Sequence, residues 1–422
     1  MEYNYTKRQG QMRWLVILSI LFWTSLASAH QSCLVADVDS GYIFEKENAS
    51  IPYPPASLTK VMTLYLTFSA LQQGWLKMED PLPISEWAAS QEPSNLDLVP
   101  GDVISVREAI LALIVKSAND VAVVLGEALG GSEEKFAAIM TEAATQLGMR
   151  NTSFKNASGL HHPEQYSCAR DLAVLTLALI KNFPQYYPLF ATQSFTYHNR
   201  EYQTHNHVLQ EYIGAEGLKT GYISAVGYNI ISTAKQNDTR LVGIVIGGKT
   251  HTQRDEQVKS LLDRAFKRAR KQKQAVAKGV IKPAFDPLHR NVIVNKLNMN
   301  VFAPQMKWAL KNSLALGQRY AEDQKHKPVL ELPSIPDIAD TPLNSHWMVQ
   351  VGAFRSIDTA GDMAQKAKTL LGRKQLIIHT PQKNATTYRA QLFGFTTKEE
   401  ARSACSFLQN HHIDCFVSWG ST

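Results

Sequence analysis

Apolar and polar positions along the chain predict two groups of strands separated by a long helical region. Residues 33–45 alternate around Asp39-Ser40-Gly41, which predicts a β-hairpin. Residues 58–71 are apolar almost all round, which predicts a helix buried in the middle of a domain. Strands at both ends of this region with helices between them indicate an α+β domain with one antiparallel sheet. The other expected elements are helices at 105–116, 119–129, 133–148, 171–179 and 253–273, and strands at 228–234 and 241–246 in a hairpin arrangement that begins at Lys219.

The regular pattern weakens from residue 275 to residue 343. Pro328, Pro333, Pro336 and Pro342 stand there in a polar stretch, which predicts a stiffened linker with one short helix near Gln305–Gly317. Order returns near residue 346, where strands and helices follow one another as β-α-β-β-α-β. We therefore expect a second, small domain of the split-βαβ type at residues 344–422.

The N-terminus carries an export address. Lys7, Arg8 and Arg13 precede an apolar run at 14–23, and Ala27-Ser28-Ala29 follows. A basic segment, a short apolar run and a small-residue triplet are typical of a secretory signal peptide, which we place at residues 1–29. The alternative is an uncleaved N-terminal anchor, although the apolar run is short for a membrane span. No other segment is long and apolar enough to be an anchor in the mature chain.

Composition excludes some classes of function. The chain has 422 residues, 44% of them hydrophobic and 19% charged, with a net charge of +7. Much of the positive charge lies at residues 267–278, where no aromatic residues interleave, so a solvated helix end is favoured over a nucleic-acid site. Two of the four cysteines, Cys405 and Cys415, are ten residues apart, and export permits a disulfide between them. No ligand set has the spacing of a zinc site, and we expect no metal and no cofactor.

Three short motifs contain the residue types of a serine acyl-transfer site. Ser57-Leu58-Thr59-Lys60 places a nucleophile and an amine one helical turn apart, on the same face. A serine hydroxyl needs a base, and lysine is a base only if burial and a nearby cation lower its pKa. The expected helix at residues 58–71 would bury the Lys60 amine, and Lys219 is the candidate for the nearby cation. Taken alone, this motif is more often an ordinary helix start.

The second and third motifs add polar groups to this site. Ser117-Ala118-Asn119 falls between two expected helices, where Ser117 is a candidate for relaying a proton and Asn119 for orienting the substrate. An N-cap is the alternative for Asn119. Lys219-Thr220-Gly221 opens a strand, and an extended peptide can add to such an edge, with Gly221 removing an obstructing side chain. The alternative is a hairpin turn with a solvated lysine.

The motifs and their order resemble those of the penicillin-binding, serine-type D-alanyl-D-alanine carboxypeptidase family. The resemblance implies a β-lactamase/transpeptidase-like domain at residues 30–274 and an acyl-enzyme on Ser57. It also implies an oxyanion hole formed by the backbone N–H groups of Ser57 and Tyr222. Thr220 and Arg254 would hold the terminal carboxylate of a peptidoglycan stem peptide, and β-lactams would be covalent inhibitors. The matching stretches are 55–60, 116–120, 156–160 and 217–222, with Arg254 downstream.

The C-terminal segment is similar to SPOR domains. Residues 347–354 look like the opening strand of such a domain, and 393–395 and 415–417 continue the match. The similarity implies binding to glycan strands that lack stem peptides. The β-rich second domain and the C-terminal amphipathic anchor of many related carboxypeptidases are not evident. Wall binding is therefore expected in place of a membrane anchor, in the periplasm or cell envelope of a Gram-negative bacterium.

Three alternative functions share parts of this pattern. A class A β-lactamase needs a glutamate after the second motif, but residues 150–160 contain none, and Glu164 lacks the expected Leu-Asn sequel. A D,D-endopeptidase of cross-links uses the same machinery and stays open. A non-catalytic wall-binding protein is disfavoured because the motif residues are intact.

Overall fold

The structure is a computed structural model, and it describes residues 31–278, 297–326, 347–354, 363–364, 366–368, 371, 377–379, 388–395, 397–410 and 413–419. The predicted signal peptide at residues 1–29 lies outside these residues. The described chain forms two compact units. The large unit comprises the described residues up to 326 apart from the hairpin tip at 196–201, and the small unit comprises those from 347 onward.

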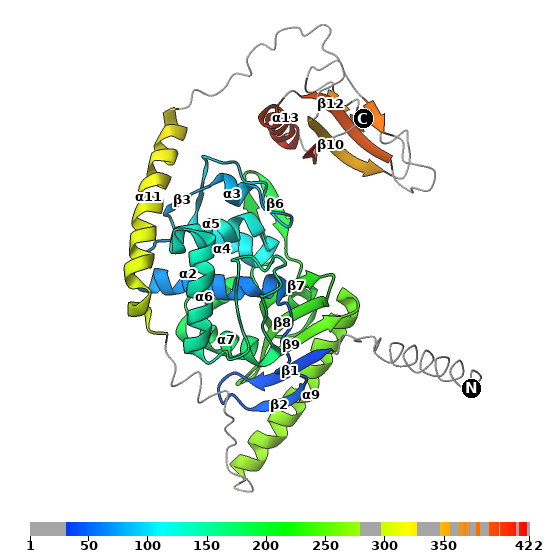
Figure 1. Cartoon of the computed structure of the whole chain (residues 1–422). Helices are drawn as coiled ribbons and strands as arrows, with labels where there is room; N and C mark the ends of the chain where they lie inside the picture. The colour runs from blue at the N-terminus through cyan, green and yellow to red at the C-terminus, as the bar shows by residue number, and fades with distance from the viewer. Residues whose placement is uncertain are drawn as a thin grey trace, which may run out of the picture. The chain divides into compact units, whose positions relative to one another are not determined.

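A five-stranded antiparallel sheet forms the framework of the large unit (Figure 1). Its strand order is β2-β1-β9-β8-β7, so β1 of the N-terminal hairpin pairs with β9, about two hundred residues later in the chain. This arrangement confirms the predicted α+β class and the hairpin at residues 33–45. The strands are β1 (Ser32–Asp37), β2 (Ile43–Glu47), β7 (Ala215–Ile223), β8 (Gly227–Gln236) and β9 (Thr239–Gly248).

Helices cover both faces of this sheet (Figure 1). On one face, α9 (His251–Ala277) packs Val258, Leu262 and Phe266 against β1, β8 and β9. On the other face, α7 (Ala169–Asn182) packs against β1 and β9. Because both faces are covered, β9 is apolar over almost its whole length rather than alternating.

The helical region behind the sheet is arranged around α2 (Lys60–Gln72). Every residue of α2 from Lys60 to Leu71 is buried, as its continuous apolar sequence predicts. α5 (Asn119–Gly130), α6 (Glu133–Leu147) and α7 all contact it. The remaining elements of the large unit up to residue 211 are η1 (Ala56–Thr59), β3 (Pro81–Pro83), α3 (Glu86–Ala89), β4 (Val103–Ser105), α4 (Val106–Leu111), η2 (Ala112–Lys116, a π-helical turn), η3 (Tyr187–Ala191), β5 (Ser194–Tyr197), β6 (Arg200–Gln203) and α8 (His207–Glu211).

The segment predicted to be a linker contains a long helix that belongs to the large unit. α11 (Ala303–His326) follows η4 (Met299–Val301) and packs against α5 and β3. Met306 and Leu310 are buried in this contact, one helical turn apart. The expected short helix near Gln305–Gly317 is therefore longer, and this part of residues 275–343 does not act as a spacer. The prolines that suggested a linker lie at 328–342, outside the described residues.

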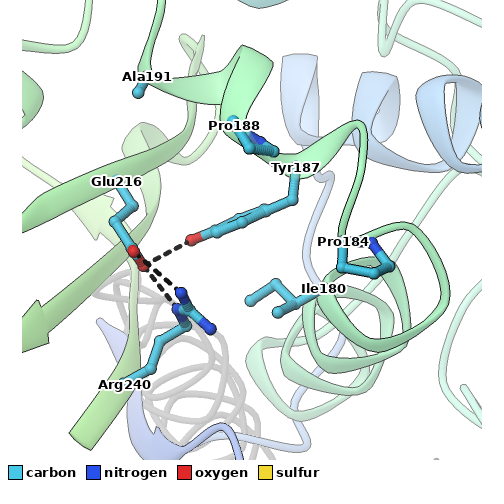
Figure 2. Close-up of a pocket in the computed structure, with 7 residues that line it drawn as sticks. All are labelled: Ile180, Pro184, Tyr187, Pro188, Ala191, Glu216 and Arg240. Carbon is cyan, nitrogen blue, oxygen red and sulfur yellow. Dashed lines mark hydrogen bonds and ion pairs between the residues drawn. The ribbon is translucent and has the colours of Figure 1, made fainter. Parts of the chain in front are cut away.

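A side-chain cluster ties β7 to the elements around it (Figure 2). Arg240 of β9 donates two hydrogen bonds to Glu216 of β7, at 2.7 and 3.0 Å. The hydroxyl of Tyr187 of η3 donates its one proton to Glu216 at 3.2 Å, and it forms a second hydrogen bond, at 2.7 Å, with the hydroxyl of Thr233 of β8, which can donate to it. The cluster lines a hollow of about 280 Å³. Its polar groups satisfy one another, so it holds the start of β7 in place.

The small unit is a four-stranded antiparallel sheet, with strand order β11-β12-β10-β13 and α13 packed against β10 and β13. Cys405 of α13 and Cys415, just before β13, are joined by a disulfide. The predicted order of strands and second helix is present, whereas the first helix expected at 358–371 lies largely outside the described residues. The elements are β10 (Trp347–Phe354), β11 (Ile377–His379), β12 (Tyr388–Phe395), α13 (Lys398–Asn410) and β13 (Phe416–Trp419).

Among the helices of the described residues, none combines the length and the apolar character that a membrane span requires.

Candidate active site

Ser57 and Lys60 meet at the junction of η1 and α2. The Nζ atom of Lys60 lies 3.1 Å from the Oγ atom of Ser57, as a three-residue helical spacing predicts. Ser57 is partly exposed, whereas Lys60 is completely buried. The hydroxyl therefore reaches the surface of a pocket while the neighbouring amine is shielded from water.

Two further acceptors surround the Lys60 amine. Its Nζ lies 2.7 Å from the side-chain oxygen of Asn119 and 2.6 Å from the carbonyl oxygen of Ser158. A neutral amine has two N–H donors and one lone pair. Because the oxygens of Asn119 and Ser158 can only accept, they take both N–H groups. The lone pair then faces the Ser57 hydroxyl, in position to take its proton.

The electrostatic surroundings favour this neutral amine. Burial lowers the pKa of Lys60 well below its ordinary value, and the positive charge of Lys219 lowers it further, against an opposing effect of Asp120. Lys219 is itself buried, and burial together with Arg254 lowers its pKa to about 7. The cation proposed from the sequence thus lies where it influences the candidate base.

Ser117 occupies an unusual backbone position between η2 and α5. Its φ of 62° is left-handed, and it is the residue that ends the π-helical turn. Its hydroxyl is buried and has no hydrogen-bond partner within the described chain. The hydroxyl oxygen of Ser117 is therefore available to form a hydrogen bond with a bound molecule.

Asn119 and Asp120 attach a loop to the start of α5. The side-chain amide of Asn119 donates to the carbonyl of Glu92 at 2.8 Å, and its backbone N–H donates to Ser94. The Asp120 carboxylate accepts from the backbone N–H groups of Leu96 and Leu98. Burial raises the pKa of Asp120 to about 6 in spite of these bonds. Because Asn119 binds Lys60 and this loop, the structure shows it as an organiser of the site itself.

The third motif runs along β7, beside η1. A Cβ atom on Gly221 would lie 3.1 Å from the backbone nitrogen of Ser57. The absence of a side chain at Gly221 therefore lets the strand approach the nucleophile, in addition to the role expected from the sequence. Thr220 is partly exposed, and the Tyr222 side chain is 58% exposed at the pocket rim.

Arg254 lies in the first turn of α9 and is almost fully buried. Its guanidinium group donates a hydrogen bond of 2.8 Å from Nε to one oxygen of Asp255 and forms an ion pair with the same oxygen through Nη2 at 2.6 Å. It also donates one hydrogen bond to the carbonyl of Asn229. These contacts hold a cation beside Lys219 at the end of the pocket. Asp255 is a positioning partner that the sequence pattern did not reveal.

The loop at residues 156–160 lies against the backbone of the segment that carries the nucleophile. Gly159 has a φ of 89°, and a Cβ atom on it would overlap the carbonyl oxygen of Ala56 and lie 2.9 Å from the nitrogen of Ser57. The carbonyl of Ala157 accepts a hydrogen bond from Thr63 of α2 at 2.7 Å. This loop matched the family pattern in the sequence, but its contacts with Ser57 and Lys60 become visible only in the fold.

These groups line one open pocket of about 440 Å³. Lys60 and Lys219 lie behind its wall, where they are buried. Gly159 and Leu160, with Pro93 and Ser94 of another loop, complete the lining near the nucleophile. The predicted site residues that face the pocket are Ser57, Ser117, Asn119, Thr220, Gly221, Tyr222 and Arg254.

Comparison with protein families agrees with this geometry. The family model of the D-alanyl-D-alanine carboxypeptidases matches residues 24–250, which is more than half of the chain. The chain belongs to the D-alanyl-D-alanine carboxypeptidase family. The resemblance inferred from the motifs is thereby confirmed, and so is the similarity of the C-terminal segment, because the SPOR domain model matches residues 343–419.

Individual members of the carboxypeptidase family resemble the large unit. The chain is 33% identical over 273 residues to the carboxypeptidase DacF of Bacillus subtilis, covering 61% of this chain and 69% of DacF. It is 34% identical over 241 residues to DacC of Escherichia coli, covering 56% of this chain and 60% of DacC. It also resembles the ampicillin-bound structure of penicillin-binding protein D2 from Listeria monocytogenes, with 29% identity, a TM-score of 0.50, and 57% of this chain and 99% of that chain covered.

The close approach of Gly159 to η1 predicts a specific sensitivity to substitution. We expect Gly159→Ala to lower the free energy of unfolding by more than the roughly 1–2 kcal/mol that a left-handed alanine costs by itself, because its methyl group would also displace the backbone of Ala56 and Ser57. Acylation of Ser57 by a fluorescent β-lactam should slow as well. Chemical denaturation and gel fluorescence measure the two effects.

Gly74→Ala is the matched control for this substitution. Gly74 has a φ of 68°, but nothing lies within 4 Å of a Cβ atom placed on it. It should therefore show the left-handed penalty without the displacement of Ser57. Equal losses of stability and unchanged acylation in the two variants would contradict the supporting role of Gly159.

The charge of Lys219 predicts a shift in the pH dependence of acylation. In Lys219→Gln the cation that lowers the pKa of Lys60 is absent. The pKa of Lys60 should therefore rise, and the acid limb of the acylation rate should move to higher pH. Lys249→Gln removes an exposed lysine and should leave the limb in place. A limb that stays unshifted in Lys219→Gln would refute the coupling of the two amines.

Proposed function

We propose that the protein is a serine-type D-alanyl-D-alanine carboxypeptidase that removes the terminal D-alanine from peptidoglycan pentapeptide stems. The contact between Ser57 and the buried amine of Lys60 carries this proposal. It combines a nucleophile open to a pocket with a base kept neutral by burial. Family membership supports the reaction class. The chain spans 69% of the length of DacF and 60% of that of DacC, and the activity proposed for the whole chain rests on the geometry of its own site.

The reaction begins with proton transfer from the Ser57 hydroxyl to Lys60. The Ser57 oxygen attacks the carbonyl carbon of the penultimate D-alanine and forms a tetrahedral oxyanion. The backbone N–H groups of Ser57 and Tyr222 are assigned to stabilise that oxyanion, since β7 and η1 lie together at Gly221. Ser117 gives its proton to the leaving amine and takes the proton held by Lys60, so both groups are restored as D-alanine departs and the ester on Ser57 forms. Water then attacks this ester and releases the shortened peptide.

The positive groups at one end of the pocket favour a substrate with a free carboxylate. Lys219 and Arg254 are both buried there, and Thr220 adds a hydroxyl. The terminal D-alanine of a stem peptide provides such a carboxylate. We assign the carboxylate to Thr220 and Arg254, and the leaving residue to the adjacent part of the pocket.

β-Lactams are proposed as covalent inhibitors that acylate Ser57. The ampicillin-bound relative from Listeria monocytogenes supports this assignment. The sequence lacks the glutamate after the second motif that a class A β-lactamase uses to activate water. The acyl-enzyme formed with a β-lactam should therefore be long-lived.

The small unit is proposed to bind glycan strands that lack stem peptides, in the periplasm or cell envelope of a Gram-negative bacterium. The match to the SPOR domain supports the binding, and the N-terminal export pattern supports the location. Phe416 on β13 is 50% exposed, while its neighbour Val417 packs toward the core. An exposed aromatic ring on a strand offers a surface for a sugar ring.

Loss of the nucleophile gives the direct test of the catalytic proposal. We expect Ser57→Ala to abolish labelling by fluorescent penicillin and to lower D-alanine release from a pentapeptide by at least about a thousandfold. Ser224→Ala, at an exposed serine in the turn after β7, should retain both. Labelling that survives in Ser57→Ala would exclude this nucleophile. Cleavage of cross-linked dimers without release of D-alanine from pentapeptide would instead indicate a D,D-endopeptidase.

Binding to the cell wall is tested with the Ser57→Ala chain, which should not hydrolyse the stem peptides of the sacculi during the assay. We expect this chain to sediment with amidase-treated sacculi, whose glycan strands lack stem peptides, and less with untreated sacculi. A version that ends at His326, the last residue of α11, should stay in the supernatant. Equal sedimentation with both kinds of sacculi would refute selectivity for bare glycan.

A further inference from the structure

Two histidines and an aspartate converge at the rim of the large-unit pocket. His207 begins α8, His251 begins α9, and Asp255 follows His251 by one helical turn on the same face. One potential ligand atom of each residue lies within 4.8 Å of those of the other two. The residues are up to 48 positions apart in the sequence, so no spacing motif announces them. The catalytic steps proposed above use none of these three side chains as a reacting group.

We propose that His207, His251 and Asp255 form a binding site for a divalent transition-metal ion of the zinc type. Imidazole nitrogen with a carboxylate oxygen is a donor set that Zn²⁺ binds well. Three protein ligands leave a fourth position of a tetrahedral site for water or for a carboxylate. This proposal concerns metal binding and does not depend on the proposed peptidase function.

The carboxylate of the site is already held in place. The side chain of Asp255 is only 6% exposed, and one of its oxygens accepts a hydrogen bond from Arg254 Nε and forms an ion pair with Arg254 Nη2. The other oxygen lies 3.7 Å from the Nδ1 atom of His207. A metal ligand whose second oxygen is hydrogen-bonded to a neighbour is the usual arrangement around protein-bound metals. Arg254 therefore orients Asp255 and offsets part of the charge that the carboxylate brings.

The two imidazoles have room to close around an ion. Their ring centroids are 5.6 Å apart with an edge-on orientation, and the His207 side chain is 47% exposed. Zinc–ligand bonds of about 2.0–2.2 Å place ligand atoms roughly 3.3 Å apart in a tetrahedral site. Small rotations of exposed side chains cover the difference.

The helices that carry the histidines are fixed to each other. Lys259 of α9 donates to Glu211 of α8 at 2.8 Å, and Tyr212, just after α8, donates to Asp263 of α9 at 2.8 Å. The separation of His207 and His251 is therefore set by the fold. Both histidines also line the pocket beside Arg254, so a bound ion would lie next to the end assigned to the carboxylate.

The test titrates the untagged full chain with ZnCl₂ after treatment with a chelator, and follows the heat of binding. We expect one ion per chain, with the affinity lowered at least tenfold in His207→Asn and in His251→Gln. His161→Asn, at an exposed histidine outside the cluster, should bind like the wild type. Zinc should also raise the unfolding temperature of the wild type and of His161→Asn, but not that of the two cluster variants.

Unfolding temperatures measured without zinc show whether each variant keeps its fold. Absence of saturable binding to the wild type would overturn the proposal. So would affinity that survives in both folded cluster variants, or affinity that falls equally in His161→Asn. Co²⁺ provides a second readout, because its visible absorption should be intense for four ligands and should weaken in either cluster variant.

Discussion

The burial of one amine is the constraint on which the site depends. A protonated Lys60 in this position would carry its charge in a medium where charges are strongly disfavoured. The fold surrounds it with polar atoms that suit the neutral form, namely the oxygens of Asn119 and Ser158 and the hydroxyl of Ser57. α2 must therefore be covered on all sides, and α5 and the 156–160 loop must each deliver one oxygen. The core packing that buries Lys60 therefore also keeps its amine neutral, so that it can act as the base for Ser57.

The nucleophile is held by backbone contacts from both sides. Gly159 approaches η1 from one segment and Gly221 from another, so the backbone of Ser57 lies where neither neighbour has a side chain. The cluster of Arg240, Glu216 and Tyr187 fixes the beginning of the strand that carries Gly221. An oxyanion site requires donors held in place before the reaction, and these contacts hold the backbone of Ser57 and β7 in that way.

The sequence predicted what local geometry and strong periodicity control. The three-residue spacing from Ser57 to Lys60 determines their contact in any helix, and the apolar run after Lys60 predicted a buried α2. The contacts of Lys60 with Asn119 and Ser158 join segments 59 and 98 residues away, so they depend on tertiary packing. The same limit applies to the convergence of His207 on α9.

The linker prediction was incomplete for a different reason. The prolines beyond residue 327 indicated a linker for the whole segment at 275–343. The apolar residues of α11 are too few to indicate which surface the helix packs against. Met306 and Leu310 are buried because α11 packs against α5 and β3, which are far away in the sequence. An amphipathic pattern identifies a helix, but the surface that receives it is known only from the fold.

The buried, unpaired hydroxyl of Ser117 has a consequence for how far this chain can be stabilised. A buried hydroxyl that has no partner among the described residues costs about 1–3 kcal/mol of stability, which a residue without this unpaired group would recover. Variants selected only for heat resistance should therefore accumulate changes around this residue. If the serine persists in such variants, it is kept for catalytic activity rather than for stability. The unpaired Ser117 hydroxyl lowers stability but is needed for the reaction.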